Sequence, residues 1–540
     1  MIDVRNLVLF NTLVQQQDTI LDDVAPTRLV FLVKHIVRGL NPESLPPPIV
    51  IECLRALRGV LPKIQDVYGE FWEEILDIVV NNLKSGPGDP ASIHANLRLI
   101  ESLRTLTKNE DSNEDLQDAW AEIKGNVSQT LVDLLVRQST TINDTHQPSQ
   151  IVNSLLGRVV SKIVSVADCD ASELFSAMAS ESPILQRAAY NILHEKIPSQ
   201  QEQVTMDAAL STSYVAKLPE ELLSLILETP DSEEYPNLKF ERDVPAPYSR
   251  YLLSWKLVFD HWINASYKVQ SDYVTGIKEG SYMKGLLDFT FKFLARGKDV
   301  KLSFNPSRFD IENYTPGEPP ESDVQWIVCH LYCLTLKHLP LLAKAWWRND
   351  CPRALEKPVE EWTEKHISPA VIRAELDTIS TWDPNPDSST SLEVKVHHRA
   401  REVVASYPID DQEMSIRLSL SPTHPLQPIS ITAIKRVAAN EKKWNAWLNT
   451  SNIVANFSSS SQGLGCVIDG LVAFRKNVAG ELKGQSECAI CYSIIDMERQ
   501  LPTKRCGTCK NLFHGSCLFK WFRSSSSSGC PLCRNAFNYA

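Results

Sequence analysis

The chain has 540 residues, of which 43% are hydrophobic and 22% are charged, and its formal net charge is −11. These proportions are ordinary for a globular protein, and the length allows three or four domains. The first residues lack the features of a signal peptide, and no stretch reaches 18 uninterrupted apolar residues. The sequence therefore predicts a cytosolic protein without a membrane partner.

The charge is unevenly distributed along the chain. Residues 391–540 hold 18 Lys and Arg against 11 Asp and Glu, a balance of +7, which leaves −18 on the preceding residues. A basic end on an acidic body suggests that the C-terminal part faces something anionic, such as RNA or an acidic protein. An ordinary solvated surface explains the same surplus, so both interpretations stay open.

Residues 1–232 are dominated by helical periodicity. Apolar residues recur at helical spacing before Pro62 at Ile49, Cys53, Leu54, Leu57 and Leu61. A second helix follows over 71–80, and a further pair is expected within 170–197. Asp170 with Glu173 has the pattern of a capping box, and Ser182-Pro183 has the pattern of a helix start. The pair resembles a HEAT repeat, which implies HEAT-like helical repeats over 1–232.

Residues 233–382 are expected to form an aromatic-rich helical domain. Its tryptophans are Trp255, Trp262, Trp326, Trp346, Trp347 and Trp362. The segment 324–345 is apolar nearly all round, which predicts one buried helix. Cys329 and Cys333 share a face of that helix but have no second ligand pair beside them. Core packing is therefore the better interpretation of these two thiols.

A short linker is expected at 383–391, because Pro, Asn, Asp and Ser dominate it. Beyond it, apolar and polar residues alternate over 414–420 and again at 429–431, which predicts two strands joined by the Pro-rich turn 422–428. Two helices are expected next, one with Trp444 and Trp447 and the other over 465–477.

This order of elements resembles the RWD domain, a relative of the fold of ubiquitin-conjugating enzymes (E2). The resemblance implies a small α+β domain over 392–480. Its one cysteine is Cys466, and no His-Pro-Asn triplet precedes it to support thioester chemistry. We therefore expect an interaction module and not an E2 enzyme.

The last part of the chain carries eight metal-ligand side chains in four close pairs. They are Cys488, Cys491, Cys506, Cys509, His514, Cys517, Cys530 and Cys533. Tetrahedral Zn²⁺ takes four sulfur or nitrogen donors, so eight ligands predict two closed, structural zinc sites. Core cysteines or a disulfide framework are the alternatives, and a cytosolic setting disfavours disulfides.

Ligand count alone allows two consecutive zinc ribbons or an interleaved pair of sites. Residues 484–540 resemble a RING finger of the C4HC3 type, whose sites interleave as a cross-brace. The resemblance implies one zinc on Cys488, Cys491, His514 and Cys517, and the other on Cys506, Cys509, Cys530 and Cys533. PHD fingers share the ligand order but usually carry Trp two residues before the seventh ligand, where this chain has Ser528.

The RING resemblance also implies a binding site for an E2. Its groove would be formed by Ile490, Trp521 and Pro531, and Arg534 would be the linchpin that hydrogen-bonds both E2 and ubiquitin. No catalytic nucleophile is expected, because a RING ligase positions the E2–ubiquitin thioester and forms no covalent intermediate. The alternative is that Ile490 and Trp521 only pack the small zinc core.

Several words of the sequence are similar to the listerin family of ribosome-associated ligases. They are 401–407, Lys443-Trp444, 469–471, 488–492, 513–522 and 530–534. The family implies a mainly α fold with HEAT-like repeats, then the RWD domain, then the two-zinc RING. Listerins are several times longer, so this chain is expected to correspond to a C-terminal portion.

Membership of that family implies a RING-type E3 ubiquitin transferase of ribosome-associated quality control. Such a ligase binds the 60S ribosomal subunit and other quality-control components. It promotes transfer of ubiquitin from an E2 to lysines of stalled nascent chains, which are then degraded by the proteasome. Basic residues of the RWD domain would dock on the ribosome, namely Arg399, Arg401, Lys435, Arg436, Lys442 and Lys443. The alternative function is a non-enzymatic, zinc-stabilised binding or scaffold module.

Overall fold

The structure is a computed structural model, and it describes residues 4–17, 19–40, 45–85, 88–109, 112–140, 147–211, 213–230, 244–295, 302, 304–317, 319–385, 392–409, 412–437, 441–457, 466–482, 487–492, 494, 501–525 and 528–537. The chain divides into two compact units. The first comprises residues 1–204, 218–231 and 237–264, and the second comprises 205–217, 232–236 and 265–540.

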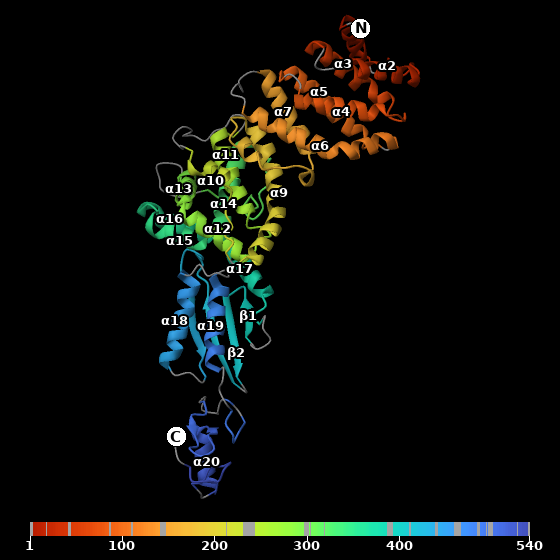
Figure 1. The fold of residues 1–540 in the computed structure, drawn as a ribbon. Coiled ribbons are helices and arrows are strands. Elements are labelled where there is room, and N and C mark those ends of the chain that lie inside the picture. The colour runs from red at the N-terminus through yellow and green to blue at the C-terminus, as the bar shows by residue number, and fades with distance from the viewer. Residues whose placement is uncertain are drawn as a thin grey trace. The chain divides into compact units, whose positions relative to one another are not determined.

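The first unit is a two-layer array of antiparallel helices. The helices are α1 Val4–Gln16, α2 Pro26–Gly39, α3 Pro47–Val60, α4 Phe71–Ser85, α5 Pro90–Leu106, α6 Glu114–Ser139, α7 Gln147–Ile163, α8 Leu174–Ala177, α9 Pro183–Leu210 (whose last residues fall in the second unit), α10 Glu220–Leu227 and α11 Ala246–Asp260, with short 3₁₀ turns at Leu61–Lys63 and Val166–Asp168. Helices α1, α3, α5 and α7 pack in succession as one layer, and α2, α4 and α6 form the other (Figure 1). Each helix buries one apolar face between the layers, which is how helical repeats share a core.

Several helix starts follow from local chemistry. The side chain of Asp89 accepts a hydrogen bond from the Ser92 N–H at the start of α5, and Asn113 does the same for Leu116 at the start of α6. Such caps satisfy backbone donors that have no partner within the helix. The helices expected over 49–61 and 71–80 are present as α3 and α4.

The expected helix pair within 170–197 is only partly right. Helix α9 begins at Pro183 as predicted, but it continues past Pro198 to Leu210. The preceding helix α8 is only four residues long. The predicted capping box is wrong, because the Asp170 carboxylate accepts from the N–H of Ser172 two residues on, in a tight local turn.

The second unit begins with a further group of helices. They are α12 Tyr267–Glu279, α13 Tyr282–Leu294, α14 Pro320–His338, α15 Pro340–Asn349, α16 Arg353–His366 and α17 Ser368–Thr381. The single buried helix predicted over 324–345 is wrong, because the chain bends by 107° between α14 and α15. Pro340 causes the break, since it has no N–H to continue α14 and its fixed φ suits the first turn of α15.

Within the described residues, no single helix has both the length and the apolar character needed to cross a bilayer. The bent pair of α14 and α15 meets that test when the two are taken together, by length and composition alone.

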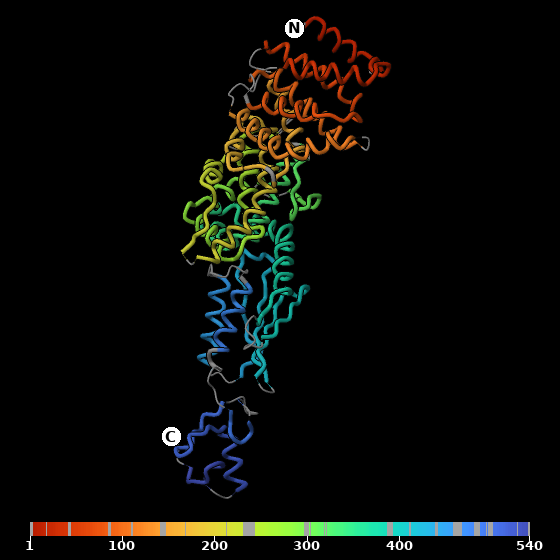
Figure 2. The backbone as a smooth tube through the Cα atoms, turned by 45° about the vertical axis from the view of Figure 1, so that its right-hand side comes forward, coloured from red at the N-terminus to blue at the C-terminus, as the bar shows by residue number. Residues whose placement is uncertain are grey.

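An antiparallel sheet follows the helices of the second unit. Its strands are β1 Glu393–His397, β2 Glu402–Ile409, β3 Gln412–Ser419 and β4 Ser430–Lys435, in the order β1-β2-β3-β4. Helices α18 Glu441–Phe457 and α19 Cys466–Leu482 lie on one side of this sheet (Figure 2). The register aligns Ala405 with Ile416 and Val403 with Leu418, so the apolar residues of β2 and β3 face the helices together.

The mainly α fold with a small α+β module after helical repeats confirms the predicted fold class. Strands β3 and β4 and helices α18 and α19 match the elements expected from the sequence, whereas β1 and β2 were not predicted. The expected linker 383–391 lies outside the described residues from 386 onward. Gly465 and the ends of the expected RING range, 484–486 and 538–540, are also outside them.

Helix α17 joins the core of the sheet. Its apolar residues Ile372, Leu376 and Ile379 pack with those of the strands and of α19. On the same helix, Glu375 accepts a 3.0 Å hydrogen bond from the N–H of Val467 at the start of α19, and its other oxygen lies 2.5 Å from Nε2 of the buried His424. Burial alone would raise the pKa of Glu375, but His424 and these hydrogen bonds outweigh it and hold the pKa below the ordinary value of 4.5.

We predict that Glu375→Ala lowers the free energy of unfolding by about 3 kcal/mol, because the buried His424 loses the carboxylate with which it pairs. The measurement is the denaturation midpoint together with hydrogen exchange at the N-terminus of α19. The exposed Glu361, in an ion pair with Lys357 on the surface, provides the matched control Glu361→Ala, which should change the stability by less than ~1 kcal/mol.

The pH dependence of this effect follows from the lowered pKa. A carboxylate with a depressed folded pKa stabilises the fold fully above its unfolded pKa of 4.5 and loses that contribution as pH falls through its folded pKa. The difference between wild type and Glu375→Ala should therefore shrink below about pH 4.5. A difference that stays constant down to pH 3 would contradict an ionised Glu375.

Candidate metal centre

The C-terminal segment has a very small apolar core. Its regular elements are the two-residue strands β5 Lys504–Arg505 and β6 Leu512–Phe513 and the helix α20 Gly515–Ser525. Phe513 and Leu518 are buried, and the Phe537 ring contacts Phe513 and Phe522 edge to face. So few apolar residues cannot hold a segment of this size together without further crosslinks.

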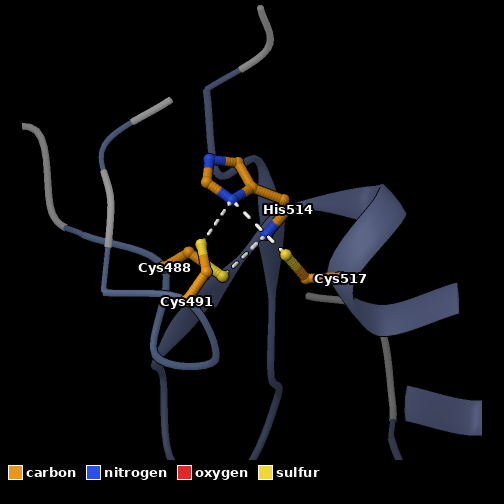
Figure 3. Close-up of side chains that lie close together, drawn as sticks. All are labelled: Cys488, Cys491, His514 and Cys517. Carbon is orange, nitrogen blue, oxygen red and sulfur yellow. Dashed lines mark hydrogen bonds between the residues drawn. The ribbon is translucent and has the colours of Figure 1, made fainter. Parts of the chain in front are cut away.

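Four ligand side chains of this segment converge in the first cluster, Cys488, Cys491, His514 and Cys517 (Figure 3). Their sulfur and nitrogen atoms all lie within 4.8 Å of one another. Nδ1 of His514 is 3.3 Å from Sγ of Cys491 and 3.8 Å from Sγ of Cys517. These separations are those of donors that surround one small ion.

The other ring nitrogen of His514 fixes which tautomer is present. Nε2 lies 3.2 Å from the carbonyl oxygen of Ile494. A carbonyl can only accept, so Nε2 carries the proton and Nδ1 keeps its lone pair toward the three thiols. A histidine held in this way by a backbone carbonyl is the usual arrangement of a metal ligand.

The second cluster contains Cys506, Cys509, Cys530 and Cys533. Sγ of Cys506 is 3.9 Å from Sγ of Cys533, and Sγ of Cys509 is 3.7 Å from Sγ of Cys530. The first and third ligand pairs of the sequence thus meet in one cluster and the second and fourth in the other. This interleaved grouping is the one that the RING resemblance implies, and it differs from two consecutive ribbons.

Three of the ligand pairs share one backbone geometry. In each Cys-x-x-Cys loop, the residue after the second cysteine donates its N–H to the carbonyl of the first, at 2.8 Å for Tyr492, 3.0 Å for Lys510 and 3.0 Å for Arg534. All three residues have φ near +60°, in the left-handed region. The tight turn aims both thiols of a pair the same way. Glycine would adopt this conformation without strain, yet Tyr, Lys and Arg occupy it here.

Local hydrogen bonds lower the pKa values of some thiols in the clusters, and burial raises those of others. Hydrogen bonds from Asn511 lower the pKa of Cys509 to about 6, and the Cys509 N–H lowers the pKa of Cys506. Burial and the neighbouring sulfurs raise the pKa of Cys517 to about 12, and burial raises the pKa of Cys530 to about 11. Adjacent thiolates repel one another, so a cation is needed before every sulfur of a cluster can ionise.

The residues expected to contact an E2 differ in their surroundings. Ile490 is half-buried against the small core, so the packing interpretation holds in part for this side chain. Trp521 on α20 is 37% exposed and lies outside that core, and its Nε1 donates a 3.1 Å hydrogen bond to the carbonyl of Gly529. Pro531 is half-buried and Arg534 is exposed.

Four residues that shape the surface or the first cluster of this segment were not predicted from the sequence. Tyr492, Phe519 and Leu532 are large, exposed apolar side chains, and the carbonyl of Ile494 orients His514. Hydrophobic periodicity could not predict that these side chains are exposed, because the Cys-x-x-Cys loops and not a regular repeat determine exposure in so small a domain.

No other metal-binding group of this kind occurs among the residues that the structure describes. Cys329 and Cys333 are fully buried in α14, and burial raises the pKa of Cys333 to about 11. A thiol in that state is a poor metal ligand and packs as a small apolar side chain.

Comparison with known families identifies three matched regions. Residues 165–380 match the LTN1 family HEAT repeat region, 392–481 match a ubiquitin conjugating domain-like family, and 486–534 match the Ring finger domain. The HEAT match runs across residue 232, where the sequence suggested a change of domain.

Several curated proteins named E3 ubiquitin-protein ligase listerin are similar to the chain. The protein of Neurospora crassa is 33% identical over 99% of this chain and 34% of its own length. The Schizosaccharomyces pombe protein is 28% identical over 99% of this chain and 34% of its own length, and the Saccharomyces cerevisiae protein is 32% identical over 59% and 20%. The chain thus spans about a third of the length of the first two relatives.

We predict that His514→Ala lowers the metal content by one ion per chain. The first cluster then keeps only three of its four donor side chains. Metal content of the purified full chain is the measurement. Cys351→Ala is the control, since Cys351 is a buried thiol outside both clusters, and it should leave the metal content unchanged. Unchanged metal in His514→Ala would show that His514 is not a ligand.

Proposed function

The chain belongs to the listerin family, and from that membership we propose that it contains the ubiquitin-transfer module of a RING-type E3 ligase. The observation that carries the proposal is the interleaved pair of four-ligand clusters, beside which Trp521 stays exposed. The module acts by positioning an E2–ubiquitin thioester and forms no covalent bond with ubiquitin.

Each cluster binds one Zn²⁺ in this proposal, and both ions are structural. The donor sets, three sulfurs with one imidazole nitrogen and four sulfurs, are those that zinc prefers in closed tetrahedral sites. With all four positions taken by protein donors, such a site has no room for substrate or water. The zinc therefore supplies folding energy, and the chemistry belongs to the thioester of the E2.

The E2-binding surface consists of Ile490, Trp521 and Pro531. The hydrogen bond from Trp521 to Gly529 fixes the indole and ties α20 to the loop before Pro531. A fixed aromatic side chain loses little conformational entropy on binding, which suits it to anchor a protein partner. Arg534 lies next to the last ligand, where its guanidinium can donate to both E2 and ubiquitin.

The wider role follows the family. The chain acts in the cytosol on stalled nascent polypeptides, with the 60S ribosomal subunit and other quality-control components as partners, and marks nascent-chain lysines with ubiquitin for degradation. Arg399 and Arg401 support this role, because both are exposed in the β1–β2 turn. Lys435 and Arg436 instead face the carboxylates of Glu413 and Glu441 at 3.8 and 4.0 Å.

A non-enzymatic scaffold is the competing function, and ubiquitin discharge separates the two. The zinc-loaded full chain is mixed with each of a panel of ubiquitin-charged E2 enzymes and free lysine, and thioester loss is timed. A ligase accelerates discharge with at least one E2. A chain that accelerates none across the panel is a scaffold, and the ligase proposal is then withdrawn.

We predict that Trp521→Ala slows E2 discharge by roughly tenfold or more, because it removes a central anchor of the interface. Phe519→Ala is the matched control, since Phe519 is an aromatic of the same helix, 66% exposed, two residues away and therefore on another face. Both variants should retain two zinc ions. Full activity in Trp521→Ala would exclude the proposed groove.

Arg534 permits a test that separates its guanidinium from its backbone. Arg534→Gly keeps the left-handed turn and loses only the side chain, so we predict slower discharge at unchanged zinc content. Lys510→Gly is the control, because Lys510 occupies the same backbone position in another loop of the second cluster. If both variants lose activity equally, Arg534 has no specific role in transfer.

A further inference from the structure

The two layers of the first unit differ in charge. Helices α1, α3, α5 and α7 carry seven Arg and Lys against two carboxylates, Glu52 and Glu101. Helices α2, α4 and α6 of the other layer carry eight Asp and Glu against six Lys and Arg, and all eight carboxylates lie on α4 and α6. A basic helix layer thus lies within a part of the chain whose net charge is strongly negative.

Most of these cations gather on the accessible faces of α3, α5 and α7. The gathered cations are Arg55, Arg58, Arg98, Arg158 and Lys162, to which His94 adds a titratable group. Three of them reach one carboxylate: Glu101 lies 3.3 Å from Arg98, 3.2 Å from Arg158 and 3.2 Å from Lys162. Glu52 lies 2.7 Å from Arg55 and also accepts a hydrogen bond from Asn11.

This basic face, as we name these six side chains, has an excess of positive charge. Five permanent cations face two carboxylates, which leaves three net positive charges before His94 is counted. Burial and the neighbouring Arg98 and Arg55 lower the pKa of Arg58, and burial with Arg98, Arg58 and Arg55 lowers the pKa of His94. The cations therefore repel one another in the free protein, and an anion bound among them would relieve that repulsion.

The surroundings of the basic face indicate which kind of anion fits. Among the exposed large apolar side chains of the described residues, α3, α5 and α7 contribute only Ile151, and the others of this layer are Val8, Leu9 and Leu13 on α1 at its edge. Peptide partners need apolar or aromatic anchors, whereas phosphate-binding surfaces are polar and positively charged. These three helices contain no Phe, Tyr or Trp, and His94 is their single aromatic ring, so they lack a row of stacking platforms for successive unpaired bases.

We propose that the basic face binds the phosphate backbone of double-stranded RNA. Adjacent helices of a layer lie about 8–10 Å apart, so cations on three successive helices span roughly 20 Å, which suits a polyanion and not a single phosphate group. Arginine predominates, and its planar fork pairs with phosphate oxygens bidentately. This binding is independent of sequence and of the ubiquitin-transfer module.

The test uses the zinc-loaded full chain and a fluorescent 20-base-pair RNA duplex, with binding measured by anisotropy over a series of salt concentrations. The variant Arg55→Gln/Arg58→Gln/Arg98→Gln should lose roughly two orders of magnitude in affinity at low salt. Its plot of log affinity against log salt should be less steep by about three, one for each lost phosphate contact.

The matched control removes three exposed cations of α2 in the same unit, as Arg28→Gln/Lys34→Gln/Arg38→Gln. It should bind as wild type does, and all variants keep the same basic C-terminal part. Glu101→Gln removes a carboxylate from the basic face and should bind RNA about threefold more tightly, an effect that misfolding cannot produce.

Three results would overturn the proposal. The first is unchanged RNA binding in the triple variant, and the second is an equal loss in the α2 control. The third is equal competition, in which a polyglutamate peptide of equal charge displaces the labelled duplex as well as unlabelled duplex does. The basic face would then be a site for acidic protein segments.

Discussion

The interleaving of the two ligand clusters is the constraint on which the C-terminal module depends. Cys491 and His514 are 23 residues apart, and Cys506 and Cys533 are 27 apart, so each cluster closes a long loop. Part of each loop contributes ligands to the other cluster. Neither cluster can therefore assemble without ordering the segment that the other one needs. Ions bound in both clusters would replace the larger apolar core of other domains, which fits the small number of buried side chains in this segment.

The same constraint decides which side chains the module presents. Ile490 and Pro531 lie inside Cys-x-x-Cys loops, Arg534 follows the last ligand, and Trp521 lies one helical turn after Cys517 on α20. Each is within four residues of a cluster side chain, so the cluster loops set its position, and Ile490 also packs against the small core. Preorganisation of this kind suits a protein-binding surface, because little order has to be gained on binding.

The sequence is informative where a pattern has a single physical cause. Paired ligands indicate metal sites because few other roles need four donors at that spacing. Helical periodicity located α3 and α4, and the Ser182-Pro183 pattern located the start of α9. Strand β2 was missed because Ala405, Ser406 and Tyr407 are buried in succession, which removes the alternation that marks a half-exposed strand. The break at Pro340 was missed because apolar character outweighed a proline that fits the first turn of a new helix. The grouping of ligands could not be derived from spacing at all, since both pairings close loops of allowed length.

The distribution of charge on the folded first unit differs from the distribution along the sequence. Summed over residues 1–390, the chain is acidic, and the surplus of positive charge in the linear sequence lies in the C-terminal part. In the folded first unit, however, the acidic residues gather on α4 and α6, while α3, α5 and α7 bring arginines from positions 55 to 158 onto one surface. Because electrostatic interactions between exposed groups decay within about 10 Å at physiological salt, a polyanion responds to that surface and not to the total. A helical repeat array converts residues about 50 apart in sequence into neighbours, so its charged faces emerge only once the layers are known.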